Sequence, residues 1–214
     1  RRRRAMTQPE QQPLALADHV VGAGTPMLLL HGGTGSHRHW VRITAALARH
    51  FRVHAPDLPG YGDSPDVPIG RDIPMRGYKE IDGSLAARRE VAHHNLQAMM
   101  LADPASIDDE AIDQQLWNVA HSRYNSLRVS HRDCLIPDLS RLRCPLQVIW
   151  GAADPMAHPS PAARAERVRR ACPDARLEFV PGGSHWVQYE RPDDIVRLLI
   201  NFHAPAAAAP TEQK

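Results

Sequence analysis

Short apolar runs alternate with stretches of helical periodicity in the first part of the chain. Residues 27–30 are a continuous apolar run, which is typical of a strand covered on both faces, and a weaker alternation over 15–21 precedes it. Residues 40–50 repeat apolar side chains at helical spacing, and residues 51–55 are predicted to be the next strand. This order predicts a strand–helix–strand unit whose parallel strands are joined by a right-handed crossover.

The last third of the chain has the same alternation. Apolar runs at 146–150 and 176–180 predict two further strands, and residues 162–171 and 192–202 have the spacing of amphipathic helices. Strands that alternate with helices indicate an α/β fold. We therefore expect a mostly parallel sheet flanked by helices.

The middle of the chain has a different pattern. No apolar run of the strand type lies between residues 64 and 144. Residues 85–100 have helical periodicity, with Ser84 placed as their N-cap, and the capping residues Ser106, Asp108 and Asp109 predict a second helix that reaches about Asn125. Residues 135–142 mix polar and apolar positions and are expected to lead into the next strand. The whole block predicts a helical cap.

These patterns divide the chain into five segments. The ends, residues 1–13 and 204–214, have the polar or Ala/Pro-rich composition of disordered segments. Residues 14–68 and 144–203 are expected to be the two parts of one α/β core, and residues 69–143 the cap between them.

Composition narrows the classes of function. The chain has 214 residues, 43% of them hydrophobic, which is enough for one soluble domain. A formal net charge of +2 argues against nucleic acid or an anionic membrane as a partner. Three cysteines without close spacing argue against disulfides and zinc, and favour the cytoplasm. No run could span a membrane, and no signal-peptide apolar region follows the N-terminal arginines.

The candidate chemistry lies after the last two predicted strands. Asp154 follows the strand at 146–150, and His185 follows the strand at 176–180. Parallel strands end at one edge of a sheet, so these side chains are expected to meet there. A nucleophilic serine needs such an acid–histidine pair beside it. That serine normally sits in a Gly-x-Ser-x-Gly turn, and no such pentapeptide occurs in this chain.

Other potential nucleophiles have better structural explanations. Ser64 ends a Gly-Asp-Ser stretch, which is only half of a nucleophile turn. Ser36 is no better placed, and Ser184 precedes His185 directly, which usually turns its side chain elsewhere. Cys134 lies in the predicted cap, and the sequence around it has no nucleophile-turn motif. It is therefore expected to be a small buried residue of the cap. The nucleophile is therefore unknown.

Metal and nucleotide sites are not expected. His37 and His39 have no carboxylate close by in sequence, and His93 and His94 are adjacent, so they point to different faces of a helix. The glycines at 32, 33 and 35 have neither dinucleotide-fold nor phosphate-loop spacing. We expect no cofactor, and a small molecule as substrate or ligand.

Four stretches together resemble the α/β-hydrolase fold superfamily, in the order of that family and over roughly residues 14–203. They are Leu29-Leu30-His31-Gly32-Gly33-Thr34-Gly35, Ala55-Pro56-Asp57-Leu58-Pro59-Gly60-Tyr61-Gly62-Asp63-Ser64, Ile149-Trp150-Gly151-Ala152-Ala153-Asp154 and Gly183-Ser184-His185-Trp186. The tail from Gly183 to Phe202 is most similar to carbon–carbon bond hydrolases of aromatic degradation and to related esterases. The glycine-rich stretch after the first strand departs from the usual pattern of the carbon–carbon bond hydrolases.

The resemblance implies roles for individual residues. Asp154 would be the triad acid and His185 the general base, and the N–H of Gly33 would supply half of an oxyanion hole. The substrate pocket would be formed by His31, Gly32, Trp40 and Trp186.

The resemblance also implies that part of the fold is missing. Family members have a helix, the nucleophile strand, a second helix and another strand between the glycine-rich loop at 55–64 and the cap, or roughly 56 residues. Here the cap-like block starts a few residues after Ser64. We therefore expect a truncated α/β-hydrolase fold in which an internal deletion has removed the serine and the second oxyanion donor. Self-association through exposed sheet edges is expected too.

Two functions follow as expectations. The first is a hydrolase acting on a small, mostly apolar ester or vinylogous ketone by acyl-transfer chemistry, with activity impaired by the missing serine. The second is a non-catalytic remnant that binds a small apolar ligand or a partner chain.

Overall fold

A computed structural model describes residues 15–66, 83–124 and 135–203. Three subjects of the sequence-based expectations lie outside these residues. They are the ends expected to be disordered (1–13 and 204–214), the first part of the expected cap, and Cys134.

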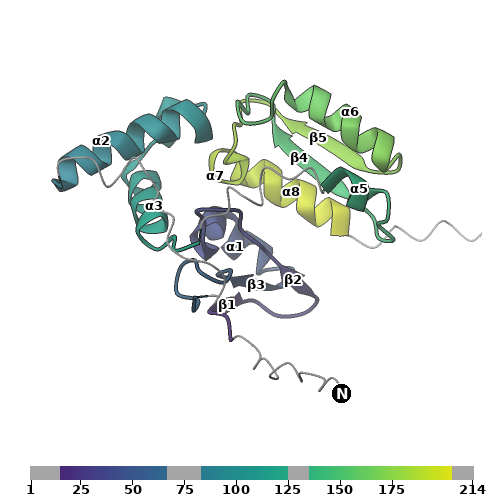
Figure 1. Cartoon of the computed structure of the whole chain (residues 1–214). Coiled ribbons are helices and arrows are strands. Elements are labelled where there is room, and N and C mark those ends of the chain that lie inside the picture. Colours follow the sequence, from purple (N-terminus) through teal and green to yellow (C-terminus); the bar gives the residue numbers. More distant parts are fainter. Residues whose placement is uncertain (1–14, 67–82, 125–134, 204–214) are drawn as a thin grey trace, which may run out of the picture.

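The first part of the core is the expected strand–helix–strand unit. Strand β3 is the centre of a three-stranded sheet, antiparallel to β1 and parallel to β2. A short 3-10 helix, η1, and then α1 connect β2 to β3 (Figure 1). The bounds are β1 (Asp18–Val21), β2 (Pro26–Leu28), η1 (His37–Trp40), α1 (Val41–Leu47) and β3 (Arg52–Pro56).

The described part of the middle block is helical, as the periodicity predicts. Ser84 caps α2 by accepting a hydrogen bond from the N–H of Ala87, and Asp108 caps α3 by accepting one from the N–H of Ala111. The helices lie to one side of the core (Figure 1). Their bounds are α2 (Leu85–Asn95), the π-helical turn η2 (Leu96–Met100), η3 (Pro104–Ser106) and α3 (Asp109–Ala120).

The second part of the core is built on two parallel strands, β4 and β5, which pair from Gln147 with Arg176 to Gly151 with Val180. The segment that leads into β4 begins with a short helix, α5. The bounds are α5 (Leu135–Leu139), β4 (Gln147–Gly151), α6 (Pro161–Ala171), β5 (Arg176–Val180), α7 (Val187–Glu190) and α8 (Pro192–His203).

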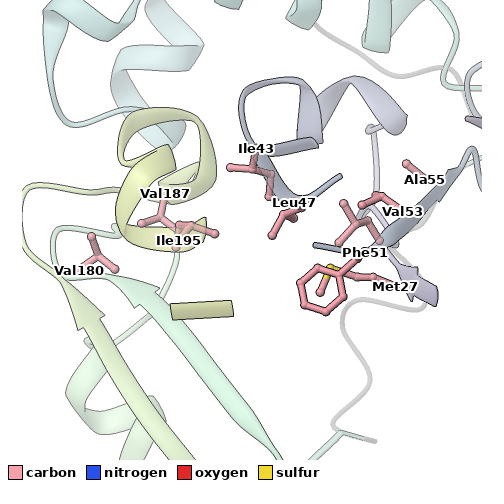
Figure 2. Packing of buried hydrophobic residues seen from close by; sticks show 10 residues of the cluster. Met27, Ile43, Leu47, Phe51, Val53, Ala55, Val180, Val187 and Ile195 are labelled. Carbon is pink, nitrogen blue, oxygen red and sulfur yellow. The ribbon is translucent and has the colours of Figure 1, made fainter. Parts of the chain in front are cut away.

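One hydrophobic cluster joins the two parts of the core. Ile43 and Leu47 on α1 are fully buried, and they pack in one cluster with Val187 of α7 and Ile195 of α8 (Figure 2). Val53 of β3 belongs to the same cluster. Burial of such side chains contributes about 1.5–3 kcal/mol each. This cluster fixes the loops after β2 and β5 relative to each other.

The strands form two separate sheets rather than one. Among the described residues, β2 pairs only with β3, and β4 pairs only with β5, so each has an unpaired edge. The apolar run at 27–30 was expected to be covered on both faces, which is wrong. Met27 and Leu29 are buried, but Leu28 and Leu30 are 60% and 53% exposed.

The architecture is that of an α/β protein with parallel pairs of strands flanked by helices. None of its described helices has both the length and the apolar character that crossing a bilayer requires.

Candidate active site

The loops after β4 and β5 are locked together at the carboxyl ends of the two strands. The N–H of Ala152 donates to the carbonyl oxygen of Val180, and the N–H of Ala153 donates to that of Gly183, each at 3.0 Å. A Cβ on Gly151 would lie only 2.1 Å from the carbonyl oxygen of Ser184, so glycine is required where the loops cross. The pairing register thus places residue 154 beside residue 185.

Asp154 and His185 meet at this crossing. The Nδ1 atom of His185 lies 3.1 Å from Oδ2 and 3.3 Å from Oδ1 of Asp154. The N–H of Met156 donates to Oδ1 at 2.8 Å and helps to hold the carboxylate. The side chain of Asp154 is 8% exposed, whereas that of His185 is 42% exposed. A buried acid therefore orients an accessible imidazole and leaves Nε2 as the nitrogen available for chemistry.

A cavity of about 400 Å³ opens beside the imidazole. Its lining includes His185, Trp186, Trp40, Gly32 and Gly33, so most of the pocket residues expected from the sequence lie together. Apolar side chains of the cap, Met99, Met100 and Val119, complete the wall. The volume lies within the range of small-molecule sites.

The glycine-rich loop presents backbone to this cavity. No described residue accepts a hydrogen bond from the N–H of Gly33, so this donor is available to a ligand. The next residue, Thr34, has a φ of 55°, which is uncommon for a residue other than glycine. Such strain is often kept where a loop must hold a functional shape.

His31 was expected in the pocket, and the structure corrects this. Its side chain is buried and is not part of the cavity lining. Its Nε2 accepts a hydrogen bond from the N–H of Leu58 at 2.9 Å, and Nδ1 lies 2.7 Å from the carbonyl oxygen of Gly32. Burial lowers the pKa of His31. A neutral His31 thus braces the glycine-rich loop from behind.

His39 is a cavity residue that the sequence gave no reason to select. It is buried against Trp186, with ring centroids 4.8 Å apart, and its Nε2 has no partner among the described residues. Burial, with smaller contributions from the charges of His31 and His185, lowers its pKa to about 3. Trp40 also has a buried ring N–H without a described partner. These unpaired groups can recognise a polar atom of a ligand.

The serines near the site have structural roles. Ser64 donates to the carbonyl oxygen of Asp57 at 2.6 Å, and Ser36 donates to Oδ1 of Asn118 at 2.6 Å. Ser184 is buried. Within residues 15–66, 83–124 and 135–203, no serine, threonine or cysteine side chain hydrogen-bonds the imidazole of His185.

The histidine loop is tied to the cap by Glu190. One carboxylate oxygen accepts the N–H groups of Ala102 and Asp103 at 2.6 and 2.9 Å, and the other accepts that of Ser184 at 2.6 Å. The N–H of Trp186 also donates to the carbonyl oxygen of Met100 at 2.9 Å. The residue next to His185 is thus held by a buried carboxylate that also holds the cap.

Two family models match the chain in consecutive parts. The model described as alpha/beta hydrolase fold matches residues 25–70, and the one described as Alpha/beta hydrolase family matches residues 70–198. A soluble epoxide hydrolase of Corynebacterium sp. is 39% identical over 74 residues, or 35% of this chain and 23% of that protein. A 2-hydroxy-6-oxo-2,4-heptadienoate hydrolase of Pseudomonas putida is 45% identical over 47 residues, or 21% of this chain and 17% of that protein. These matches span less than a quarter of either relative.

The fold comparison extends over nearly the whole chain. A thermophilic esterase of Thermogutta terrifontis superposes with a TM-score of 0.64 at 19% identity, over 92% of this chain and 95% of that one. Because the second model alone matches more than half of the residues, the chain is a member of the alpha/beta hydrolase family.

Proposed function

We propose that this chain is a weakened hydrolase of small, mostly apolar esters or vinylogous ketones, in which His185 activates water directly. The observation that carries the proposal is the Asp154–His185 pair at the wall of the cavity, with Gly33, whose N–H has no acceptor among the described residues, in the same lining. The similar proteins include an esterase and a 2-hydroxy-6-oxo-2,4-heptadienoate hydrolase, and these names support the two substrate classes.

The reaction needs one proton acceptor and one oxyanion donor. Nε2 of His185 takes a proton from water while the water oxygen forms a bond to the substrate carbonyl carbon. The N–H of Gly33 donates to the resulting oxyanion. The protonated imidazole, stabilised by Asp154, then gives its proton to the leaving alkoxide or carbanion as the bond to the carbonyl carbon breaks. Without a covalent intermediate or a second described oxyanion donor, the rate is expected to be low.

Hydrolysis of a short-chain p-nitrophenyl ester tests this proposal. His185→Ala should lower the rate by about 100-fold, the lower range for a general base. His50→Ala is the matched control, because His50 is an exposed histidine in the turn after α1. The control should keep the wild-type rate. Equal rates for wild type and His185→Ala would contradict the proposal.

The second candidate is a non-catalytic remnant that binds a small apolar ligand. It is favoured by one observation, which is that no described hydroxyl or thiol bonds to His185. Quenching of tryptophan fluorescence by a non-hydrolysable ketone analogue would report binding, because Trp40 and Trp186 line the cavity. Saturable quenching together with equal ester rates for wild type and His185→Ala would select the remnant.

A further inference from the structure

A second cluster of chemically competent side chains lies away from the candidate active site. His19, on β1, His37, at the start of η1, and Asp57, just after β3, place one potential ligand atom each within 4.8 Å of one another. They belong to three separate stretches of the chain. We propose that His19, His37 and Asp57 bind a divalent transition-metal ion such as Zn²⁺.

Two of the three ligands are held in place by their surroundings. Asp57 is fully buried, and its carboxylate accepts the N–H groups of His37 and Asp63 at 2.7 and 2.9 Å. The Nδ1 atom of His37 lies 3.0 Å from Oδ1 of Asp57. Two ligands of a tetrahedral zinc ion stand about 3.3 Å apart, because each bond is roughly 2.0–2.1 Å long. Asp57 and His37 therefore have nearly the required separation.

The third ligand can adjust. The ring of His19 stacks on that of His37, with centroids 3.4 Å apart, and His19 is exposed. Its ring can therefore turn until its lone pair points to the same place as that of His37. Binding also requires the proton on Nδ1 of His37 to move to Nε2, which leaves the imidazole neutral. Two imidazoles and one carboxylate suit zinc, cobalt or nickel rather than magnesium or calcium.

The two histidines of the cluster have access to solvent through a cavity, and Asp57 lies buried behind them. His19 and His37 line a cavity of about 740 Å³ between β1, α1 and α3, which leaves room for water ligands. Glu110 and Asp113 belong to the same lining, and they are paired with Arg42 and Arg89 respectively. The one cationic side chain of the described lining, Arg38, lies over the ring of Trp117 at 4.0 Å. Metal binding here would tie β1 to η1 and to the loop after β3, and it does not depend on the proposed hydrolase activity.

Calorimetric titration of the metal-free full chain with Zn²⁺ tests the site. We expect one equivalent to bind, and His19→Ala and His37→Ala each to weaken its affinity by at least about tenfold. His54→Ala is the matched control, because His54 pairs with Asp18 at 2.8 Å on the same sheet but lies outside the cluster. It should bind like the wild type.

Three results would overturn the proposal: no zinc binding by the wild type, equal affinity in His19→Ala and wild type, or an equal loss in His54→Ala. Because His19 is exposed, its replacement should leave the fold intact, which circular dichroism can check. The absorption spectrum of bound Co²⁺ gives a second readout, since the intensity of the visible bands reports the coordination number.

Discussion

At the scale of single residues, the candidate site consists of groups whose neighbours fix their charge and direction. Asp154 is buried and orients His185, and His39 is a neutral buried imidazole in the wall of the same cavity. The sequence was sufficient to select Asp154 and His185, because each follows an apolar run at a position where parallel strands end. It could not select His39, because its burial depends on Trp186, which is far away in the chain.

His39 gives the protein a pH-dependent stability. An unfolded histidine takes up a proton near pH 6.5, whereas folded His39 resists protonation down to about pH 3. Between these values the unfolded state binds more protons, so stability falls as the pH falls from 6.5. Above pH 6.5 this group contributes no pH dependence. The slope from one such group approaches about 1.4 kcal/mol per pH unit.

Urea unfolding between pH 4 and 7 measures this effect. His39→Gln should reduce the slope by nearly the amount of one group, and His50→Gln, an exposed histidine, should leave the slope unchanged. Parallel slopes for wild type and His39→Gln would contradict a neutral buried His39.

At the scale of elements, periodicity predicted the type of the helices and strands in the described core and cap. The bounds of β5 coincide with the expectation, and α2 and α3 begin at the predicted caps. The predictions failed where burial or contact depends on residues that are distant in the sequence. Residues 27–30 were expected to be buried on both faces, but Leu28 and Leu30 are exposed. The histidine cluster was missed because His37 and Asp57 are brought together by the fold.

Glu190 couples the cap to the histidine loop, and its loss should weaken both. Glu190→Gln keeps the shape but turns an amide group toward donors on one side, so at least one backbone N–H loses its acceptor. An unpaired buried group costs about 1–3 kcal/mol, and we expect a loss of about 2 kcal/mol in the free energy of unfolding. Urea unfolding measures it.

The matched control is Glu166→Gln, because Glu166 is an exposed glutamate that forms an ion pair with Arg169 on the same helix. It should change stability by less than about 0.5 kcal/mol. If Glu190→Gln lowered the free energy of unfolding as little as the control does, the hydrogen bonds of Glu190 would not stabilise the contact between the cap and the histidine loop.

At the scale of the whole molecule, the strands form two separate sheets, and within the described residues β2 and β4 each pair along one edge only. The family model that matches residues 25–70 ends where the next one begins, so the chain passes from one part of the family pattern to the other without the serine motif. We infer that a deleted segment, with its central strands and the helices that would flank them, accounts for both the absent nucleophile and the exposed side chains of Leu28 and Leu30. The missing length remains a prediction from the family pattern, and that pattern did not indicate which strand edges would be open.

The open edge of β2 should make the chain associate with itself. Leu28→Lys places a charge on this edge, and charges on edge strands oppose pairing with another chain. Sedimentation velocity over a range of concentrations should show association of the wild type and less of it for Leu28→Lys. Leu85→Lys is the control, because Leu85 is equally exposed but lies on α2. A monomeric wild type, or equal effects of the two substitutions, would contradict this inference.

The claim that His185 acts on water without a serine partner is tested most directly by a fluorophosphonate label. This reagent phosphonylates serines that are activated by a neighbouring histidine. After incubation of the full chain and digestion with a protease, mass spectrometry of the peptides should find no phosphonylated serine. A single serine labelled in the wild type but not in His185→Ala would contradict the account, because the histidine would then already serve a nucleophile.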